Sequence, residues 1–186
     1  MFSITRFLVA CAGSMAFALT VHAAGFTLSS PTIKPGSTLT DAQVFNGFGC
    51  SGKNISPALS WQGAPAGTKS FAVTLYDPDA PTGSGWWHWV VYNLPATANA
   101  LPESAGAAGG AGLPAGSAMG RTDFGSAAFG GACPPAGDKP HRYQFTIFAV
   151  DIDQLDAEEQ SSAAVVGFNL HFHTLARTTL TGLYGR

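Results

Sequence analysis

The sequence predicts a mainly β fold with one helix near the C-terminal end. Segments rich in β-branched and aromatic residues predict strands over residues 69–77, 86–94 and 142–150. Apolar residues repeat at helical spacing over residues 161–180, after these strands. Because the strands come first and the helix last, the order favours an antiparallel sheet or a sandwich with a helix at its edge. A parallel sheet built from βαβ units is disfavoured.

Each predicted strand has a recognisable boundary in the sequence. Residues 69–77 end before Pro78 and Pro81, because proline removes a donor from the hydrogen-bond ladder. Residues 86–94 are apolar on both faces, which predicts a central strand. Residues 96–118 are rich in Ala, Gly and Pro and predict a long surface loop before the third strand.

The predicted helix over residues 161–180 has capping residues at its start. Ser161 and Ser162 can accept hydrogen bonds from the first free backbone N–H groups. The apolar residues at steps of three or four predict one apolar helix face, made of Ala164, Val165, Phe168, Phe172 and Leu175.

The composition favours one globular domain that binds neither nucleic acid nor a membrane interior. The chain has 186 residues, of which 46% are hydrophobic and only 11% are charged. Its 23 Gly and 12 Pro suit a loop-rich β domain. The sequence contains no basic patch of the kind that binds nucleic acid. Beyond the N-terminal segment, no apolar run is long enough to span a membrane.

The N-terminal segment, residues 1–23, predicts a secretory signal peptide. Arg6 precedes an uncharged apolar stretch over residues 7–21, and small residues precede a cleavage site after Ala23. A membrane anchor is the alternative, but a spanning helix needs about 20 apolar residues and this run is shorter. We therefore expect a domain over residues 24–186 that is periplasmic or secreted.

The three cysteines also bear on whether the protein is exported. Cys11 follows a pattern that resembles a lipoprotein signal, but most of the apolar core follows this residue, which disfavours that alternative. Cleavage after Ala23 leaves Cys50 and Cys133, and an even pair in an oxidising compartment usually forms a disulfide. Two buried thiols are the alternative.

Three short loops at strand boundaries carry the residues suited to ligand binding. They span residues 77–81, 85–89 and 130–138, and the last is followed by His141 and Tyr143. Strand ends on one rim of a sheet can converge on one pocket. We therefore expect these loops to form a single site.

The side chains of these loops suggest an anion or a small zwitterion as ligand. His88, His141 and Tyr143 can donate hydrogen bonds, and Trp86 can supply an apolar or cation–π wall. Asp77 and Asp79 would repel an anion unless they are paired. For each histidine, a purely structural role is the alternative.

In order along the chain, these motifs resemble the phosphatidylethanolamine-binding protein family. They are Asp-Pro-Asp-Ala-Pro at 77–81, Trp-X-His at 86–88, and Gly-X-X-Pro-Pro-X-Gly-X-X-X-His-Arg-Tyr at 131–143. The resemblance covers residues 26–182. The segments 55–61 and 77–95 are similar to the bacterial Raf-kinase-inhibitor-like branch, and the signal and paired cysteines to its periplasmic members.

The resemblance implies a large antiparallel or mixed central sheet packed on a smaller sheet, with an anion pocket at one rim. Family members bind phosphate-like head groups, and some modulate kinases or proteases. The positions that match the family's pocket residues are Asp77, Asp79, Trp86, His88, Pro135, His141 and Tyr143. Eukaryotic members have a further helix over the pocket, whereas this sequence stops soon after Leu183, which disfavours kinase inhibition.

These observations predict an exported, non-enzymatic binding or regulatory protein for a small anionic or zwitterionic ligand. A protease- or kinase-modulating interaction module and a weak hydrolase with an Asp–His pair are the alternatives. The sequence leaves open whether the protein has a protein partner or forms a homodimer.

We expect no cofactor and no metal, because Asp77 and Asp79 lack the Gly and Glu of a calcium loop. His171 and His173 are two residues apart on the predicted helix and so point in different directions, which disfavours a shared metal site.

Overall fold

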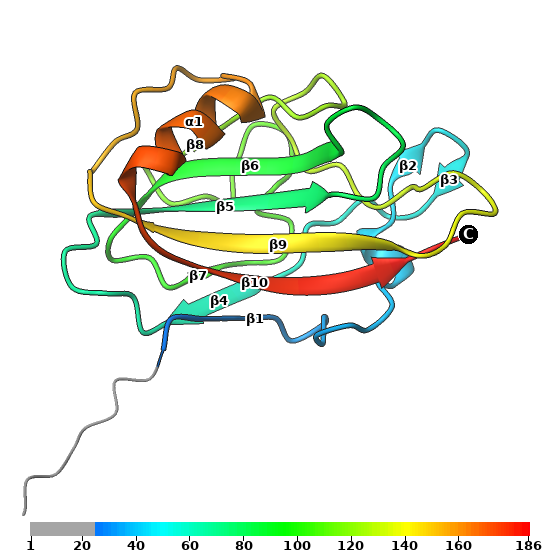
Figure 1. Cartoon of the computed structure of the whole chain (residues 1–186), viewed down its shortest axis with the longest axis horizontal. Helices are drawn as coiled ribbons and strands as arrows, with labels where there is room; N and C mark the ends of the chain where they lie inside the picture. The colour runs from blue at the N-terminus through cyan, green and yellow to red at the C-terminus, as the bar shows by residue number, and fades with distance from the viewer. Residues whose placement is uncertain (1–24) are drawn as a thin grey trace, which may run out of the picture.

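The computed structural model describes residues 25–186, so the predicted signal peptide over residues 1–23 lies outside the described part. The chain is mainly β, with sheets of five, three and two strands (Figure 1). The strands are β1 (Thr27–Ser29), β2 (Asn46–Gly47), β3 (Cys50–Ser51), β4 (Leu59–Gln62), β5 (Ser70–Asp77), β6 (Trp86–Pro95), β7 (Ala100–Leu101), β8 (Ala118–Met119), β9 (His141–Val150) and β10 (Thr174–Tyr184). The helices are α1 (Ala163–His173) and the 3-10 turn η1 (Asp41–Gln43).

The three strands expected from the sequence are confirmed as the centre of the large sheet. Its strand order is β10-β9-β5-β6-β8, and all neighbours are antiparallel. Strand β5 lies between β6 and β9, with Thr74 opposite both Val90 and Thr146. Almost every residue of β5 is buried, as the apolar composition of the segment predicts.

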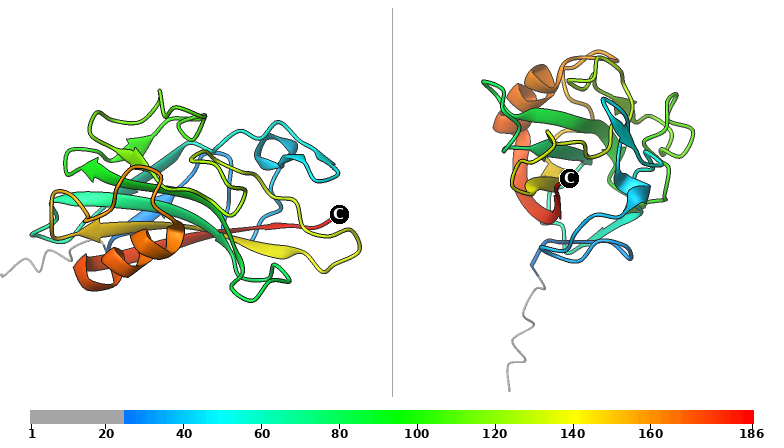
Figure 2. Two further views of the ribbon diagram at one scale, coloured as in Figure 1. Left: turned by 90° about the horizontal axis from the view of Figure 1, so that it is seen from above. Right: turned by 90° about the vertical axis from the view of Figure 1, so that its right-hand side faces the viewer.

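The small sheet, of order β1-β4-β7, packs against one face of the large one, as the family resemblance implies (Figure 2). The main core lies between the two sheets. There Trp61 of β4 and Leu101 of β7 join Phe71, Phe145 and Ile147 of the large sheet. The opposite face of the large sheet is covered by α1.

The sandwich alternative is wrong. The layer opposite the five-stranded sheet contains only short strands, and most of it is loop, including residues 102–117 and 120–140. These segments are rich in Gly, Ala and Pro, which strands disfavour. Within residues 25–186, the fold is therefore one large sheet with a mixed layer of loops and short strands on one face and helix α1 on the other.

The helix predicted over residues 161–180 is confirmed only in its first half. It ends at His173, and residues Thr174–Tyr184 form β10 at the edge of the large sheet. This strand contains four threonines, and β-branched side chains favour extended backbone over helix. The last residue of the predicted apolar helix face, Leu175, therefore lies in β10 and is partly exposed.

The expected apolar face of the helix is also not the buried one. Phe168 and Phe172 are 67% and 64% exposed. The residues that pack on the sheet are Ala163, Val166 and Leu170, which contact a cluster that includes Ala72, Tyr92 and Val150. Because the helix carries apolar residues on both sides, its periodicity alone could not identify the packed face.

The predicted disulfide is confirmed between Cys50 and Cys133. It joins β3 to the loop that precedes β9, across 83 residues of sequence. Closing so long a loop in the unfolded chain contributes about 4 kcal/mol of stability in the chain-entropy model. The bond also places the loop that carries Phe48 beside the loop that carries Pro134.

Within residues 25–186, no helix has the length and apolar character needed to cross a membrane.

Candidate functional site

The ends of three adjacent strands meet at one rim of the large sheet. Asp77 ends β5 opposite Trp86, which begins β6, and His141 begins β9 on the other side of β5. These antiparallel strands place their loops on the same rim, where they surround a cavity of about 210 Å³. Pockets for drug-sized ligands usually measure about 300–1,000 Å³, so this cavity suits a small ligand or a head group.

Six of the seven expected site residues line this cavity, which we call the rim pocket. Asp79 is the exception. The lining residues are Phe48, Asp77, Ala80, Pro81, Thr82, Trp86, His88, Phe124, Cys133, Pro134, Pro135, His141 and Tyr143.

The carboxylate of Asp77 organises the floor of the rim pocket. Its Oδ1 accepts the backbone N–H groups of Asp79 at 2.8 Å and Ala80 at 3.1 Å, which is the geometry of an Asx turn. Its Oδ2 accepts the Nδ1 hydrogen of His141 at 2.8 Å. Both side chains are almost fully buried. This bond fixes the His141 ring, whose Nε2 lies 3.5 Å from the exposed carboxylate of Asp138.

The ring of His88 is held by backbone carbonyl groups. Its Nδ1 donates to the oxygens of Gly130 at 2.8 Å and Gly131 at 3.1 Å. Any side chain at Gly131 would clash with the carbonyl of Gln43, so glycine permits this close approach. Burial lowers the pKa of His88 from 6.5 to about 4, so the ring is neutral near pH 7.

Two buried polar atoms of the rim pocket have no hydrogen-bond partner within the described residues. They are Nε1 of Trp86 and the hydroxyl of Tyr143. Burial, together with the charge of nearby Asp77, raises the pKa of the Tyr143 hydroxyl, which therefore stays protonated. Buried polar groups in proteins are nearly always satisfied, so two of them in one cavity indicate a ligand or ordered water.

Asp79 lies outside the rim pocket and forms an ion pair. Its carboxylate accepts bonds from Nε of Arg142 at 2.9 Å and Nη2 at 2.7 Å, and also from the Arg142 backbone N–H at 2.8 Å. The Arg142 guanidinium lowers the pKa of Asp79 from 3.8 to about 2. The structure thus gives Asp79 a role in joining the loop after β5 to the start of β9.

Aromatic residues that the sequence analysis did not identify form one wall of the rim pocket. The ring of Phe124 stacks on Phe45 with centroids 4.3 Å apart and meets the ring edges of Trp86 and His88. Phe48 stacks on Phe124 at 5.7 Å. The pairing of Cys50 with Cys133 was the signal that could have placed Phe48 here, whereas no pattern marked Phe124.

Arg186 secures the outer loops of the same pocket. Its guanidinium donates to the carbonyl oxygens of Pro134 at 2.7 Å, Gly49 at 3.1 Å and Phe48 at 3.3 Å. Its own carbonyl accepts the N–H of Gly137 at 2.8 Å. The two loops joined by the disulfide are therefore also joined through this side chain.

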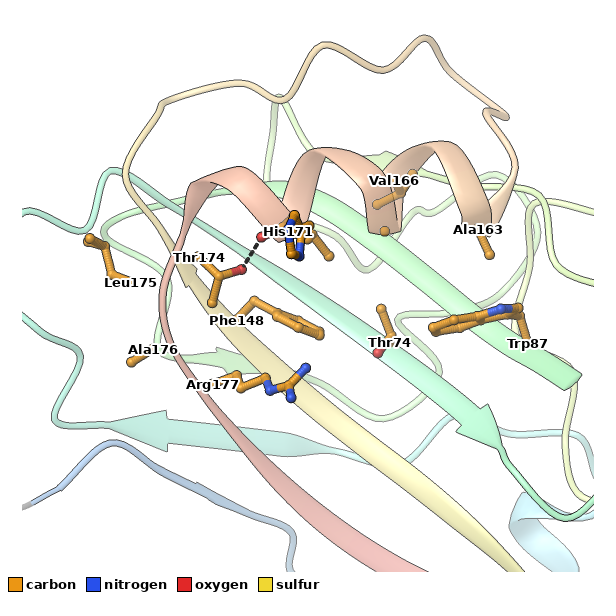
Figure 3. Close-up of a pocket in the computed structure, with 12 residues that line it drawn as sticks. Thr74, Trp87, Phe148, Ala163, Val166, His171, Thr174, Leu175, Ala176 and Arg177 are labelled. Carbon is orange, nitrogen blue, oxygen red and sulfur yellow. Dashed lines mark hydrogen bonds between the residues drawn. The ribbon is translucent and has the colours of Figure 1, made fainter. Parts of the chain in front are cut away.

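A larger hollow, of about 550 Å³, lies between α1 and the outer face of the large sheet. Thr74, Phe148 and Arg177 lie on the sheet side of this hollow, and His171 lies on its helix side (Figure 3). At the end of the helix, the Thr174 hydroxyl donates a hydrogen bond of 2.6 Å to the carbonyl oxygen of Leu170. None of the unpartnered buried atoms of the described residues lines this hollow. The rim pocket is therefore the better candidate site despite its smaller size.

The rim pocket offers hydrogen bonds but lacks the parts of several common catalytic sites. None of its lining residues is Lys or Arg, and its only cysteine is in the disulfide. Among residues 25–186, no group of three or more His, Cys, Asp or Glu side chains could hold a metal ion. The arrangement can bind a small polar ligand within an aromatic and proline wall.

Comparison with known proteins agrees with the family resemblance and with the fold. A family model described as phosphatidylethanolamine-binding protein matches residues 29–185. The UPF0098 protein YbcL of Escherichia coli is 55% identical over 163 residues, covering 88% of this chain and 89% of YbcL. The UPF0098 protein YbhB of the same organism is 53% identical over 157 residues, covering 84% and 98% of the two chains.

A solved structure extends this agreement to three dimensions. The crystal structure of YbcL, described as a new member of the mammalian PEBP family, superimposes with a TM-score of 0.86 at 54% identity. The match covers 88% of this chain and 99% of the YbcL chain.

Proposed function

Because the chain belongs to the phosphatidylethanolamine-binding protein family, we propose that it is a non-enzymatic protein that binds a small phosphate-like anion or zwitterion in the rim pocket. The observation that carries the proposal is the pair of unpartnered buried donors, Trp86 Nε1 and the Tyr143 hydroxyl. A ligand oxygen that accepts from both would satisfy them. Inorganic phosphate and phosphoethanolamine are suitable probes.

The remaining chemistry of the pocket supports binding of a head group rather than of a whole lipid. His141 lines the same pocket as the two donors and is oriented by Asp77. The walls are made of Pro81, Pro134 and aromatic rings, so the hydrogen bonds form in an environment shielded from water. Such shielding strengthens each polar contact with the ligand.

We also propose that the protein is exported and acts in the periplasm or outside the cell. The signal-like sequence over residues 1–23 and the Cys50–Cys133 disulfide support this location. Fractionation of cells expressing the full-length chain tests it. A mature form that begins at residue 24 in the periplasmic fraction is the expected result, and an uncleaved cytoplasmic form would contradict export.

A hydrolase is the second candidate, because the Asp77–His141 bond has the geometry that orients a general base. In the rim pocket, however, Nε2 of His141 faces Asp138 and not a nucleophilic side chain. Assays with phosphomonoesters and carboxyl esters separate the candidates. Turnover that is lost in His141→Ala would establish the enzyme, whereas the binding proposal expects none.

Titration of the protein with phosphate and phosphoethanolamine, followed by Trp fluorescence and by calorimetry, tests the binding proposal. We expect saturable binding that weakens at least about tenfold, or about 1.4 kcal/mol, in His141→Ala. The matched control is His171→Ala, because His171 lies on α1 away from the rim pocket. No binding at millimolar ligand, or equal affinity in the two variants, would contradict the proposal.

A further inference from the structure

We propose that the rim pocket selects oxyanions that still carry an acidic proton over oxyanions of similar shape that carry none. Dihydrogen phosphate and singly charged phosphate monoesters belong to the first class, and sulfate and phosphate diesters to the second. This inference rests on the proposed function, because it specifies the protonation state of the ligand of the same pocket. The evidence for this selectivity is the hydrogen bonding of the side chains that line the pocket.

Backbone contacts fix the tautomer of His88. Its Nδ1 faces the carbonyl oxygens of Gly130 and Gly131, and a carbonyl can only accept. Nδ1 must therefore carry the ring hydrogen. In the neutral ring this leaves a lone pair on Nε2, which has no hydrogen-bond partner within residues 25–186. Because the ring lines the cavity, a bound ligand meets an acceptor at this position.

The surroundings of His88 determine the charge of its ring. The titratable groups that face it are Asp77 on β5, His141 and Tyr143 on β9, and Asp123 in the loop after β8. The two carboxylates favour a charged ring, but burial outweighs them and lowers the pKa of His88 to about 4. The Nε2 lone pair is therefore available from about pH 5 upward.

Fixed positive charge is scarce around the rim pocket. None of its described lining residues is Lys or Arg, the guanidinium of Arg186 is occupied by carbonyl oxygens of the outer loops, and the Asp77 carboxylate is buried at the floor of the pocket beside His141. A dianion would have to leave water without a cationic partner of this kind, which is costly. A monoanion with one O–H group can donate to Nε2 of His88 while its other oxygens accept from Trp86 and Tyr143.

The test compares ligands of equal charge that differ in one proton. Methyl phosphate and dimethyl phosphate both carry a single negative charge at about pH 5, below the second ionisation of phosphate esters near 6. Only methyl phosphate retains an acidic hydrogen. Dihydrogen phosphate and sulfate form a second pair of similar size, which differs in charge as well as in acidic hydrogen. These probes lack an ammonium group, which could otherwise supply the hydrogen to His88.

We expect the wild-type protein to bind methyl phosphate at least about tenfold more tightly than dimethyl phosphate, and phosphate more tightly than sulfate by a similar factor, or about 1.4 kcal/mol. Equal affinities within either pair would overturn the inference while leaving the proposed function intact. Loss of all binding would overturn both.

The variant His88→Asn isolates the acceptor. Asparagine can keep a donor near the Nδ1 position for the two glycine carbonyls but has no group at Nε2. We expect its preference for methyl phosphate over dimethyl phosphate, which carry equal charge, to fall toward unity. If this variant does not fold, nitrogen-15 NMR of the wild-type imidazoles replaces it. A neutral His88 with hydrogen on Nδ1 in the phosphate complex is expected, and a doubly protonated ring would overturn the inference.

Discussion

Asp77 Oδ2 accepts the Nδ1 hydrogen of His141 across 2.8 Å, joining the last residue of β5 to the first residue of β9. Both residues are almost fully buried, so this bond is shielded from solvent. The same carboxylate also holds the turn at Asp79 and Ala80. One side chain therefore determines the position of a histidine in the pocket and the path of the loop beside it.

The variant Asp77→Asn tests this double role. The amide can still accept the backbone N–H groups, but its nitrogen cannot accept the hydrogen of His141. We expect a loss of about 1–3 kcal/mol in unfolding free energy, measured with urea, and weaker phosphate binding. The control Asp153→Asn changes an exposed carboxyl and should stay within about 0.5 kcal/mol of wild type. Equal stability of the two variants would contradict the role given to Asp77.

For the neighbouring carboxylate, we expect the variant Asp79→Asn to have a smaller effect than Asp77→Asn. The Asp79–Arg142 pair is partly exposed, with side-chain exposures of 31% and 53%. Exposed pairs contribute about 0.2–1 kcal/mol, so we expect a loss of that size. Because Asp79 does not line the rim pocket, the phosphate affinity should change by less than about twofold. A large loss of affinity would show that Asp79 acts on the ligand.

The buried His88 predicts a pH dependence of stability. Its pKa is about 4 in the folded protein and 6.5 as the reference for the unfolded chain. Between these values the unfolded chain binds a proton that the folded protein does not, so stability falls as pH decreases from 6.5 toward 4. The full loss is on the order of 3 kcal/mol.

Urea denaturation at several pH values measures this loss. The His88→Asn variant serves as the control, because it lacks the titrating group. Its unfolding free energy should fall less than that of wild type over the same interval. Parallel curves for the two proteins would contradict the assignment of the loss to His88.

The packed face of α1 predicts different costs for two apolar truncations. Leu170 is buried against the sheet, and Phe168 is 67% exposed. We expect Leu170→Ala to cost about 2–5 kcal/mol through the cavity it leaves, and Phe168→Ala less than about 1 kcal/mol. Chemical denaturation of both variants measures the difference. A larger cost for Phe168→Ala would show that the helix packs through its other face.

The central strands could be predicted because local composition and tertiary environment agree there. Residues 69–77, 86–94 and 142–150 are rich in residues that favour strands, and they are also the most buried part of the sheet. Edge strand β10 could not be predicted in the same way. Leu175 continues the apolar spacing of the helix, and only the pairing of the following residues with β9 distinguishes the two structures.

The pocket could be predicted to the extent that its residues lie at strand ends. Asp77, Trp86, His88 and His141 belong to motifs beside the central strands, and their convergence follows from the antiparallel order. Phe124 lies in a long loop whose path no local pattern determines. The pairing of Asp79 with Arg142, rather than with a ligand, depends on side-chain geometry that the sequence does not contain.

The loops around the rim pocket have a consequence for the order of folding. Phe48, Cys133 and Arg186 come from distant parts of the chain, yet their contacts close the same cavity. Contacts between residues so far apart form slowly, because the loss of chain entropy precedes the gain. The rim pocket is therefore complete only when nearly the whole chain has folded. A ligand held there stabilises the entire domain, by about 2.7 kcal/mol at a hundred times its Kd.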